Sequence, residues 1–398
     1  MEGWESMSFI KEVKENLTEN IIPFWEQLRD NEHGGYYGLL DFDLNLHKEA
    51  TKGVILNSRI LWFFTNAYTT LGDKECLEHA KHAYEFLKDF CLDKEYGGVY
   101  WSLNYKGEAE DSTKHTYNQA FAIYALSSYY GAAKDEQALK IAYRLYELIE
   151  TKCRDSVGYL EAFDRTFTPV DNDKLSENGL MASKTMNTLL HVFEAYTELY
   201  RVDKKEEVAN RLRWMMDQFA DVLYNKERRI LEVFFDENMN TISDLNSYGH
   251  DIEASWLIDR GCEVLGDPAY TEKMLTVTNA LREHILEAGF DGTSLNNEIF
   301  KGEIDTTKVW WVQAEALLGY INGYQLDPAK TEYLEVSKKL WNFISTYIID
   351  KREGSEWFYD LNKDGKPESK KEIVGPWKCP YHNGRMCFEV INRNVDWQ

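Results

Sequence analysis

Two histidines in separate parts of the sequence, His250 and His382, have neighbours that suggest acid–base chemistry. Glu253 follows His250 by three residues, and side chains three or four residues apart lie on one face of a helix. A carboxylate in that position can accept the ring N–H, fix the tautomer and favour the protonated imidazole. His382 comes from another segment, so the two rings can approach one carbon from opposite sides. The pair, with Glu253 as its support, predicts proton removal and proton return at a single carbon.

Inversion of carbon 2 at the reducing end of a sugar is a reaction of this type. When the sugar ring opens, the C1 carbonyl acidifies the hydrogen on C2, so a base can remove it and leave an enediolate. Reprotonation on the other face inverts the centre, and no redox cofactor is needed. Arg59 and the partly positive N-termini of helices would stabilise the enediolate oxygen.

Aromatic, amide and acidic residues accompany the histidines at positions suited to a sugar site. Asn187 with His191, and Trp311 with Glu315, are four residues apart and would share helix faces. Tryptophan faces stack on sugar rings, while the hydroxyls bind charged and amide groups. The predicted sugar-binding residues are Arg59, Tyr117, Asn187, His191, Trp256, Trp311, Glu315 and Trp377.

Arg59 stands in the apolar run ILNSRILWFF, where an unpaired charge would be costly. It therefore needs a partner, either the oxygens of a bound sugar or an internal salt bridge to Glu253 or Glu315. Both interpretations are open from the sequence. Isolated histidines in helical patterns are usually core or surface residues, and we assign His79, His82 and His284 to that group.

Metal and nucleotide chemistry have weaker support in the sequence. His191, His250, Glu253 and His382 offer imidazole and carboxylate groups that suit zinc, manganese or iron, so a metal site is an alternative. We find no G-x-G-x-x-G after a strand, no G-x-x-x-x-G-K-[ST], no H-E-x-x-H and no G-x-S-x-G. We therefore expect neither a metal nor a cofactor.

Short segments rich in glycine and aromatic residues, such as GGYYGLLDF and GGVYWSLNY, recur along the chain and predict small β-hairpins or extended loops. They recur at intervals of 60 to 72 residues. Six such segments therefore divide the chain into six units of similar size. Their markers are Gly35, Gly98, Gly158, Ile230, Phe290 and Glu356.

Two helical patterns lie between successive markers. In the first interval, residues 54–72 are apolar on nearly all faces, whereas residues 76–90 are amphipathic. A helix without a polar face must be buried, and one with a charged face must lie outside, so each unit supplies an inner and an outer helix. An open array of such units would need polar caps at its ends. We therefore predict an all-α (α/α)6 barrel, a toroid of six helical hairpins, with the short β-hairpins on the active-site side.

The candidate site residues keep the phase of this repeat. Each cluster follows its own marker by 19 to 33 residues, which places it early in an inner helix. Parallel inner helices all begin on one side of a toroid. These side chains are therefore expected to face one central cavity.

Composition argues against several classes of partner. A formal net charge of −23 without a basic block disfavours nucleic acid and anionic membranes. No apolar run approaches the roughly 18 residues of a membrane span, and the start of the sequence has no apolar signal-peptide region. The six cysteines are too scattered for a disulfide framework. We expect one catalytic domain over residues 1–398, acting as a cytoplasmic monomer on a small sugar.

The same motifs resemble the N-acylglucosamine 2-epimerase superfamily, and within it the branch that acts on cellobiose and related disaccharides. The resemblance extends over nearly the whole chain. It rests on long and specific segments, namely KGVILNSRILWFF, KHTYNQAFAIYALSSYY, LSENGLMASKTMNTLLH, SYGHDIEASWL, VWWVQAEALLG and GPWKCPYHNGRMC.

This resemblance implies an (α/α)6 barrel that works without a metal. It also implies reversible conversion of the reducing-end glucose of a β-1,4-linked disaccharide to mannose, with cellobiose, lactose and mannobiose as substrates. His250 and His382 match the family's acid/base pair, and Glu253 matches the residue that supports the first histidine. The predicted sugar-binding residues match residues that line the family's sugar site.

Four other functions remain open at this stage. An aldose–ketose isomerase of the mannose isomerase type would use the same enediolate but return the proton to C1. An N-acetylglucosamine 2-epimerase would differ in substrate. A glycoside hydrolase would need two carboxylates flanking a glycosidic bond, whereas these clusters offer histidines. A non-catalytic sugar-binding protein would explain the tryptophans but not the spacing of His250 and Glu253.

Overall fold

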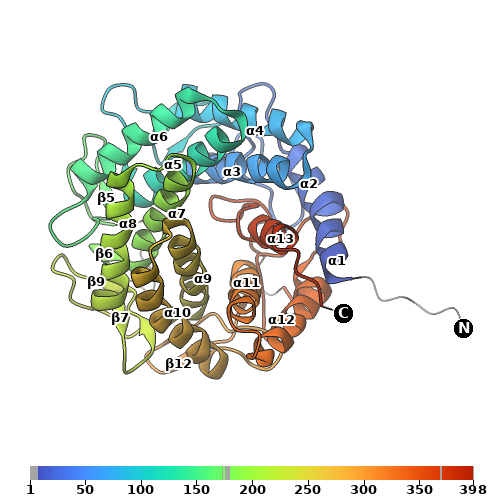
Figure 1. Cartoon of the computed structure of the whole chain (residues 1–398). Coiled ribbons are helices and arrows are strands. Elements are labelled where there is room, and N and C mark those ends of the chain that lie inside the picture. Colours follow the sequence, from blue (N-terminus) through green and yellow to red (C-terminus); the bar gives the residue numbers. More distant parts are fainter. Residues whose placement is uncertain (1–7, 173, 175–179, 368–369, 398) are drawn as a thin grey trace, which may run out of the picture.

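The chain folds into two concentric rings of helices (Figure 1). This computed structural model describes residues 8–172, 174, 180–367 and 370–397. Residues 175–179, which open the sequence motif at 175–191, lie outside the described part. Within the described residues, inner and outer helices alternate along the chain. The predicted all-α barrel is therefore confirmed.

The inner helices are buried on almost all sides because their sequences lack a continuous polar face. In α3, every residue from 54 to 65 is buried, including the polar Asn57, Ser58 and Arg59. Among the described residues, no helix combines the length and the apolar character that a membrane crossing requires. The inner helices are α3 (Val54–Leu71), α5 (Thr116–Ala133), α7 (Met186–Val202), α9 (Tyr248–Leu265), α11 (Trp310–Leu326) and α13 (His382–Asn392).

The outer helices bury one face and expose the other. Three of them begin after an aspartate, Asp73, Asp135 or Asp267, whose carboxylate accepts backbone N–H groups of the first turn. The outer helices are α1 (Phe9–Glu15) with α2 (Ile22–Glu26), α4 (Lys74–Phe86), α6 (Glu136–Leu148), α8 (Glu206–Gln218), α10 (Pro268–Ala288) and α12 (Thr331–Phe343). Short π-helical segments join or extend them at Asn16–Ile21, Leu87–Cys91, Ile149–Cys153, Phe219–Leu223 and Ile344–Ile348.

The ring closes through the two ends of the chain. The repeat pairs each inner helix with the outer helix that follows it, but α13 has no later helix among the described residues. The N-terminal α1 takes that outer position, and α13 contacts α1, α3 and α11 (Figure 1). Trp25 in α2 donates its Nε1–H to Glu356 at 2.9 Å, and Phe9 stacks on Trp397. The first and last segments thus complete one helical hairpin together.

Short strands and bridges connect each outer helix to the next inner one. The predicted hairpin markers lie beside these bridges; Tyr36, for example, pairs with Arg29, and Val99 pairs with Leu92. Gly35 has a φ of +66°, and a Cβ there would clash with a phenylalanine ring 2.6 Å away. The strands pair antiparallel in the orders β1-β2-β3, β10-β11-β12, β4-β5, β6-β9, β7-β8 and β13-β14. Their bounds are β1 (Lys52–Gly53), β2 (Ser102–Leu103), β3 (Ala109–Asp111), β4 (Lys114–His115), β5 (Ala162–Phe163), β6 (Lys184–Thr185), β7 (Tyr224–Asn225), β8 (Ile230–Leu231), β9 (Phe234–Phe235), β10 (Asn246–Ser247), β11 (Glu298–Phe300), β12 (Glu303–Asp305), β13 (Lys308–Val309) and β14 (Asp360–Leu361).

In most units, a buried lysine shortly before the inner helix forms an ion pair with a carboxylate of the preceding loop. Lys52, which pairs with Leu103 in the β1–β2 ladder, donates to Asp30 at 2.6 Å and to the Gly34 carbonyl at 2.7 Å. Asn246 occupies the equivalent place before α9. The corresponding ion pairs, in each of which the lysine is buried, are Lys114 with Asp93, Lys184 with Asp155, Lys308 with Asp291 and Lys378 with Glu356.

Replacement of Lys52 by methionine is expected to lower the free energy of unfolding by about 3–5 kcal/mol, because Asp30 would stay buried without its counterion. Urea unfolding followed by circular dichroism measures this change. Lys52→Met combined with Asp30→Asn removes both charges and should recover part of the loss. Lys74→Met, at an exposed position of α4, is the control and should change the value by less than about 0.5 kcal/mol. Equal stability of the Lys52 and Lys74 variants would contradict this role of the ion pair.

Candidate active site

A cavity of about 290 Å³ opens where the inner helices begin. Nine of the eleven residues predicted as catalytic or sugar-binding line it. Trp310, Tyr359 and Lys174 also line the cavity, and the sequence did not single them out. The lining residues are Arg59, Tyr117, Lys174, Asn187, His191, His250, Glu253, Trp310, Trp311, Tyr359, Trp377 and His382.

Several polar residues of the site occupy the same position in their helices. Arg59 in α3, His191 in α7, Glu253 in α9 and Glu315 in α11 are each the sixth residue of the helix. In α5 the same position holds Phe121. Because the inner helices surround one axis, equal positions along them form one layer of side chains. The similar spacing of the site residues from their hairpin markers in the sequence thus corresponds to similar heights along the barrel axis.

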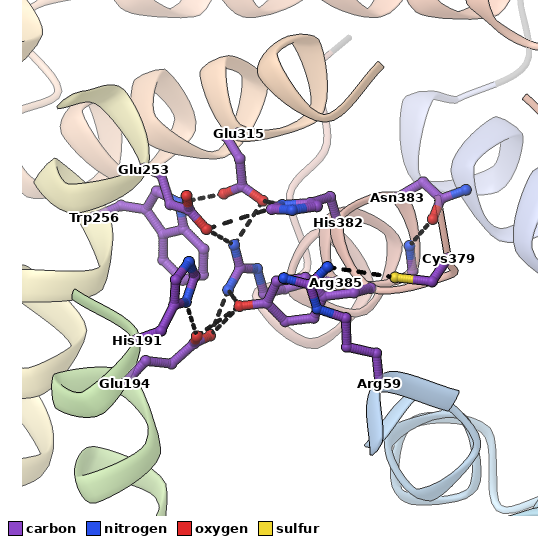
Figure 2. A network of polar contacts seen from close by, with 12 residues as sticks. Arg59, His191, Glu194, Glu253, Trp256, Glu315, Cys379, His382, Asn383 and Arg385 are labelled. Atoms are coloured by element: carbon purple, nitrogen blue, oxygen red, sulfur yellow. Dashed lines mark hydrogen bonds and ion pairs between the residues drawn. The ribbon is translucent and has the colours of Figure 1, made fainter. Parts of the chain in front are cut away.

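Two predicted sugar-binding residues, Trp256 and Glu315, lie behind the cavity wall and are not among its lining residues. Trp256 donates its Nε1–H to Glu315 Oε2 at 2.9 Å, and Glu315 Oε1 lies 2.7 Å from Nδ1 of His382 (Figure 2). A carboxylate at Nδ1 accepts that ring N–H, so Nε2 of His382 is left for the cavity. Trp256 and Glu315 therefore orient His382.

The structure does not show the predicted hydrogen bond between His250 and Glu253, so this prediction is wrong. Nδ1 of His250 lies 2.7 Å from the hydroxyl of Ser247, the residue directly before α9. The same spacing does give a contact between His191 and Glu194, so spacing alone does not decide the pairing. Here Ser247 occupies Nδ1 of His250. Glu253 instead accepts a hydrogen bond from Arg385.

Arg385 in α13 is a buried charge that joins glutamates from three other inner helices (Figure 2). Its Nη1 donates to Glu194, and its Nη2 donates to Glu253 and, at 2.6 Å, to Glu315. Glu194 also lies 2.9 Å from Nδ1 of His191. One guanidinium thus holds the carboxylates that support two of the cavity's imidazoles.

The sequence interpretation missed Arg385 and Glu194. One signal was present, because Arg385 follows His382 by three residues and Glu194 follows His191 by three. Such spacing places two side chains on one helix face. It does not indicate which charges meet across the barrel, so the network could not be assembled from the sequence.

Burial controls the protonation of the cavity residues. It lowers the pKa of His250 to about 3, and it holds the pKa of His382 well below its usual value, with repulsion from Arg385 adding to the effect. Both rings are therefore neutral and able to accept a proton. Burial also raises the pKa of Glu253 to about 8, and the nearby Glu315 carboxylate contributes to this shift.

Arg59 forms neither of the salt bridges considered for it. Its Nη2 donates to the Tyr117 hydroxyl at 2.8 Å, and its guanidinium lies over the rings of Phe121 and Tyr381 at 4.1 and 4.8 Å. Nη1 contacts Cys379 Sγ at 3.7 Å (Figure 2), and within the described part of the chain Nε is buried without a hydrogen-bond partner. Its charge is therefore available to an oxygen in the cavity.

The site also contains groups that could in principle hold a metal ion. Ligand atoms of Glu253, Glu315 and His382 all lie within 4.8 Å of one another. His191 and His250, which the sequence also offered as ligands, are not part of this group. Arg385 donates to both carboxylates, and its fixed positive charge opposes a cation between them. The group acts as a hydrogen-bonded support for His382.

Replacement of Arg385 by methionine is expected to lower the free energy of unfolding by about 3–5 kcal/mol, since three buried glutamates would lose the guanidinium that they share. Urea unfolding measures the loss. Arg385→Lys keeps the charge without the planar fork and should give an intermediate stability. Arg260→Met, which breaks an exposed pair with Glu263, should cost less than about 1 kcal/mol. An Arg385→Met protein as stable as this control would refute the role of the network.

Comparisons with known proteins find relatives that match nearly the whole chain. The sequence profile of the N-acylglucosamine 2-epimerase (GlcNAc 2-epimerase) family matches residues 34–384. A cellobiose 2-epimerase of Ruminococcus albus is 55% identical, over 97% of this chain and 99% of that protein. A solved sugar epimerase from a ruminal bacterium superposes with a TM-score of 0.96 at 55% identity, covering 98% of this chain and 100% of that one.

A second solved structure, the cellobiose 2-epimerase of Bacillus thermoamylovorans, superposes with a TM-score of 0.94 at 44% identity. The superposition covers 97% of this chain and 99% of that one. Fold, full-length coverage and sequence profile agree. The chain belongs to the N-acylglucosamine 2-epimerase family.

Proposed function

We propose that this chain catalyses reversible epimerisation at carbon 2 of the reducing-end glucose of β-1,4-linked disaccharides. Cellobiose would give glucosylmannose, with lactose and mannobiose as related substrates, and the cellobiose 2-epimerases among the relatives support this choice. The observation that carries the proposal is a pair of buried, neutral imidazoles, His250 and His382, at one cavity. Both rings pack against Trp311, with ring centroids 4.8 and 5.3 Å from it.

Proton transfer needs one unengaged nitrogen on each ring. Nδ1 of His250 is hydrogen-bonded to Ser247, and Nδ1 of His382 is hydrogen-bonded to Glu315. The Nε2 atom of each ring can therefore exchange a proton with the substrate. One imidazole removes the C2 proton from the open-chain aldose, and the electron pair moves into the C1 carbonyl to give the enediolate. The negative charge of the enediolate favours protonation of the other ring, which takes up a solvent proton at Nε2 and delivers it to C2 on the opposite face. The first ring then releases the abstracted proton to solvent, so both rings are neutral again.

Buried polar atoms at the cavity can be satisfied by sugar hydroxyls, which both donate and accept. Among the described lining residues, the buried atoms without a hydrogen-bond partner are Arg59 Nε, Asn187 Oδ1, Glu253 Oε2 and Trp310 Nε1. The guanidinium of Arg59 would stabilise the enediolate oxygen. The proposed sugar contacts are Arg59, Tyr117, Asn187, His191, Trp311 and Trp377, while Trp256 and Glu315 act by positioning His382.

The proposed enzyme acts as one catalytic domain over residues 1–398 and as a monomer, because a single chain supplies the cavity lining described above. It uses no metal or redox cofactor, since the C1 carbonyl itself acidifies the C2 hydrogen. The six cysteines are buried and free, which supports a reducing compartment such as the cytoplasm.

Incubation with cellobiose in D2O is expected to yield glucosylmannose with deuterium at C2 of the reducing-end residue. The proton returned to C2 comes from the second ring, whose N–H protons exchange with solvent, so deuterium at C2 reports the proposed step. Proton NMR of the mixture, repeated with lactose, mannobiose, mannose and N-acetylglucosamine, measures both the product and the substrate preference. A ketose product would indicate an aldose–ketose isomerase, free monosaccharides a glycoside hydrolase, and unchanged sugars a binding protein.

His250→Ala and His382→Ala should each lower kcat at least about a hundredfold, because each removes one of the two proton carriers. The rate of C2 epimer formation measures this loss, and circular dichroism checks that the fold is retained. His284→Ala, in the outer helix α10, is the matched control and should leave the rate nearly unchanged. Near-normal turnover in either cavity variant would remove that histidine from the mechanism.

A further inference from the structure

Ser247 directly precedes α9 and is a residue type that often caps helices. Its side chain forms no capping hydrogen bond, whereas Thr185 before α7 accepts the Thr188 N–H at 3.0 Å. The Ser247 hydroxyl lies instead 2.7 Å from Nδ1 of His250, and the serine is only 4% exposed. Because the Ser247 hydroxyl contacts an active-site imidazole and does not cap α9, we ask what it does for His250.

The three histidines that line the cavity differ in the partner of Nδ1. His191 faces Glu194 at 2.9 Å, and His382 faces Glu315 at 2.7 Å. The partner of His250 is a serine hydroxyl. A carboxylate stabilises a protonated ring, whereas a hydroxyl accepts the N–H of a neutral ring without adding a charge. Of the three rings, His250 therefore has the partner that least favours protonation.

The segment before α9 is also less charged than its counterparts. In four other units a buried lysine lies two residues before the inner helix, whereas Asn246 takes that place here. Asn246 donates its amide N–H to Asp251 at 2.7 Å. Two neutral side chains, Asn246 and Ser247, thus lead into the helix that carries His250.

The ionisable groups around His250 come from several helices. His191 on α7 and Glu315 on α11 act on its charge, Glu253 lies on the same helix, and His382 on α13 packs on the same tryptophan. The serine hydroxyl is the group in contact with Nδ1. A change of this hydroxyl therefore acts on the ring more directly than a change in the surrounding charges.

We propose that Ser247 is a positioning residue that accepts the Nδ1–H of His250 and so keeps Nε2 unprotonated toward the cavity. The serine selects the tautomer that can remove a proton, and it adds no negative charge that would hold the ring as an imidazolium. This inference rests on the proposed function for the role of His250. The tautomer itself can be observed without turnover.

Ser247→Ala is expected to lower kcat on cellobiose about tenfold to a hundredfold, because the buried Nδ1–H would lose its acceptor. KM should change by less than about twofold, since the serine is not among the lining residues of the cavity. Ser247→Thr keeps the hydroxyl and should retain most of the activity. Ser255→Ala, which removes a buried hydroxyl bonded to the Ile252 carbonyl in the same helix, is the matched control. Equal losses in the two alanine variants would overturn the proposal.

Ser247→Asp places a carboxylate near Nδ1 and should move the acid limb of kcat/KM to higher pH. The carboxylate favours the imidazolium and raises the pKa of His250, so the base form is lost sooner as the pH falls. The pH profile of the wild-type protein is the reference. An acid limb that stays in place or moves to lower pH would overturn the proposal.

Nitrogen-15 NMR of the full chain labelled at histidine gives a readout independent of activity, with the His250 signals assigned by comparison with His250→Ala. At neutral pH the wild-type ring should carry its proton on Nδ1, and Ser247→Ala should shift the population toward the Nε2–H tautomer. A wild-type ring in the Nε2–H form would overturn the proposal. Failure of the wild-type protein to exchange the C2 hydrogen of any sugar would instead refute the proposed function and leave the tautomer result standing.

Discussion

The guanidinium of Arg385 is the charge on which the geometry of the site depends. It belongs to α13 and donates to glutamates of α7, α9 and α11, so four of the six inner helices meet at one group. Each of these charges has lost its hydration, and a misplaced partner would leave a buried charge uncompensated. The network therefore places Glu194 and Glu315, which in turn hold the rings of His191 and His382.

The barrel combines a regular scaffold with one irregular layer. Ion pairs between a buried lysine and a carboxylate recur in five of the six units and serve stability, because they join the loop to the segment before the next inner helix. At the sixth position of α3, α5, α7, α9 and α11, by contrast, the residues are an arginine, a phenylalanine, a histidine and two glutamates. The repeated fold presents equivalent positions to one cavity, and the differences among those positions create the chemistry.

The barrel and most of the cavity lining could be predicted because both are encoded locally. Apolar faces indicate which helices are inner, and the repeat interval indicates where each inner helix begins, so residues such as Arg59 and Trp377 could be placed at one cavity. The contacts of Arg385 could not be predicted in this way. They join residues 70 to 191 positions apart, and they form only when α13 closes the ring between α11 and α3. The expected pairing of His250 with Glu253 failed because helix spacing shows that two side chains can meet but not which partner each one takes. His191 and Glu194 do pair at this spacing, whereas Glu253 binds the distant Arg385.

Burial gives the two imidazoles a property that suits reversible proton transfer. Burial depresses their pKa values, so neither ring holds a proton against the cost of desolvation. An enediolate between them would change this balance, because a negative charge in a site of low dielectric strongly favours a nearby imidazolium. The rings can then be protonated while the anion is present and become neutral again when the product is formed. Each ring can thereby hold a proton next to the intermediate, and the ring on the opposite face returns its own proton to carbon.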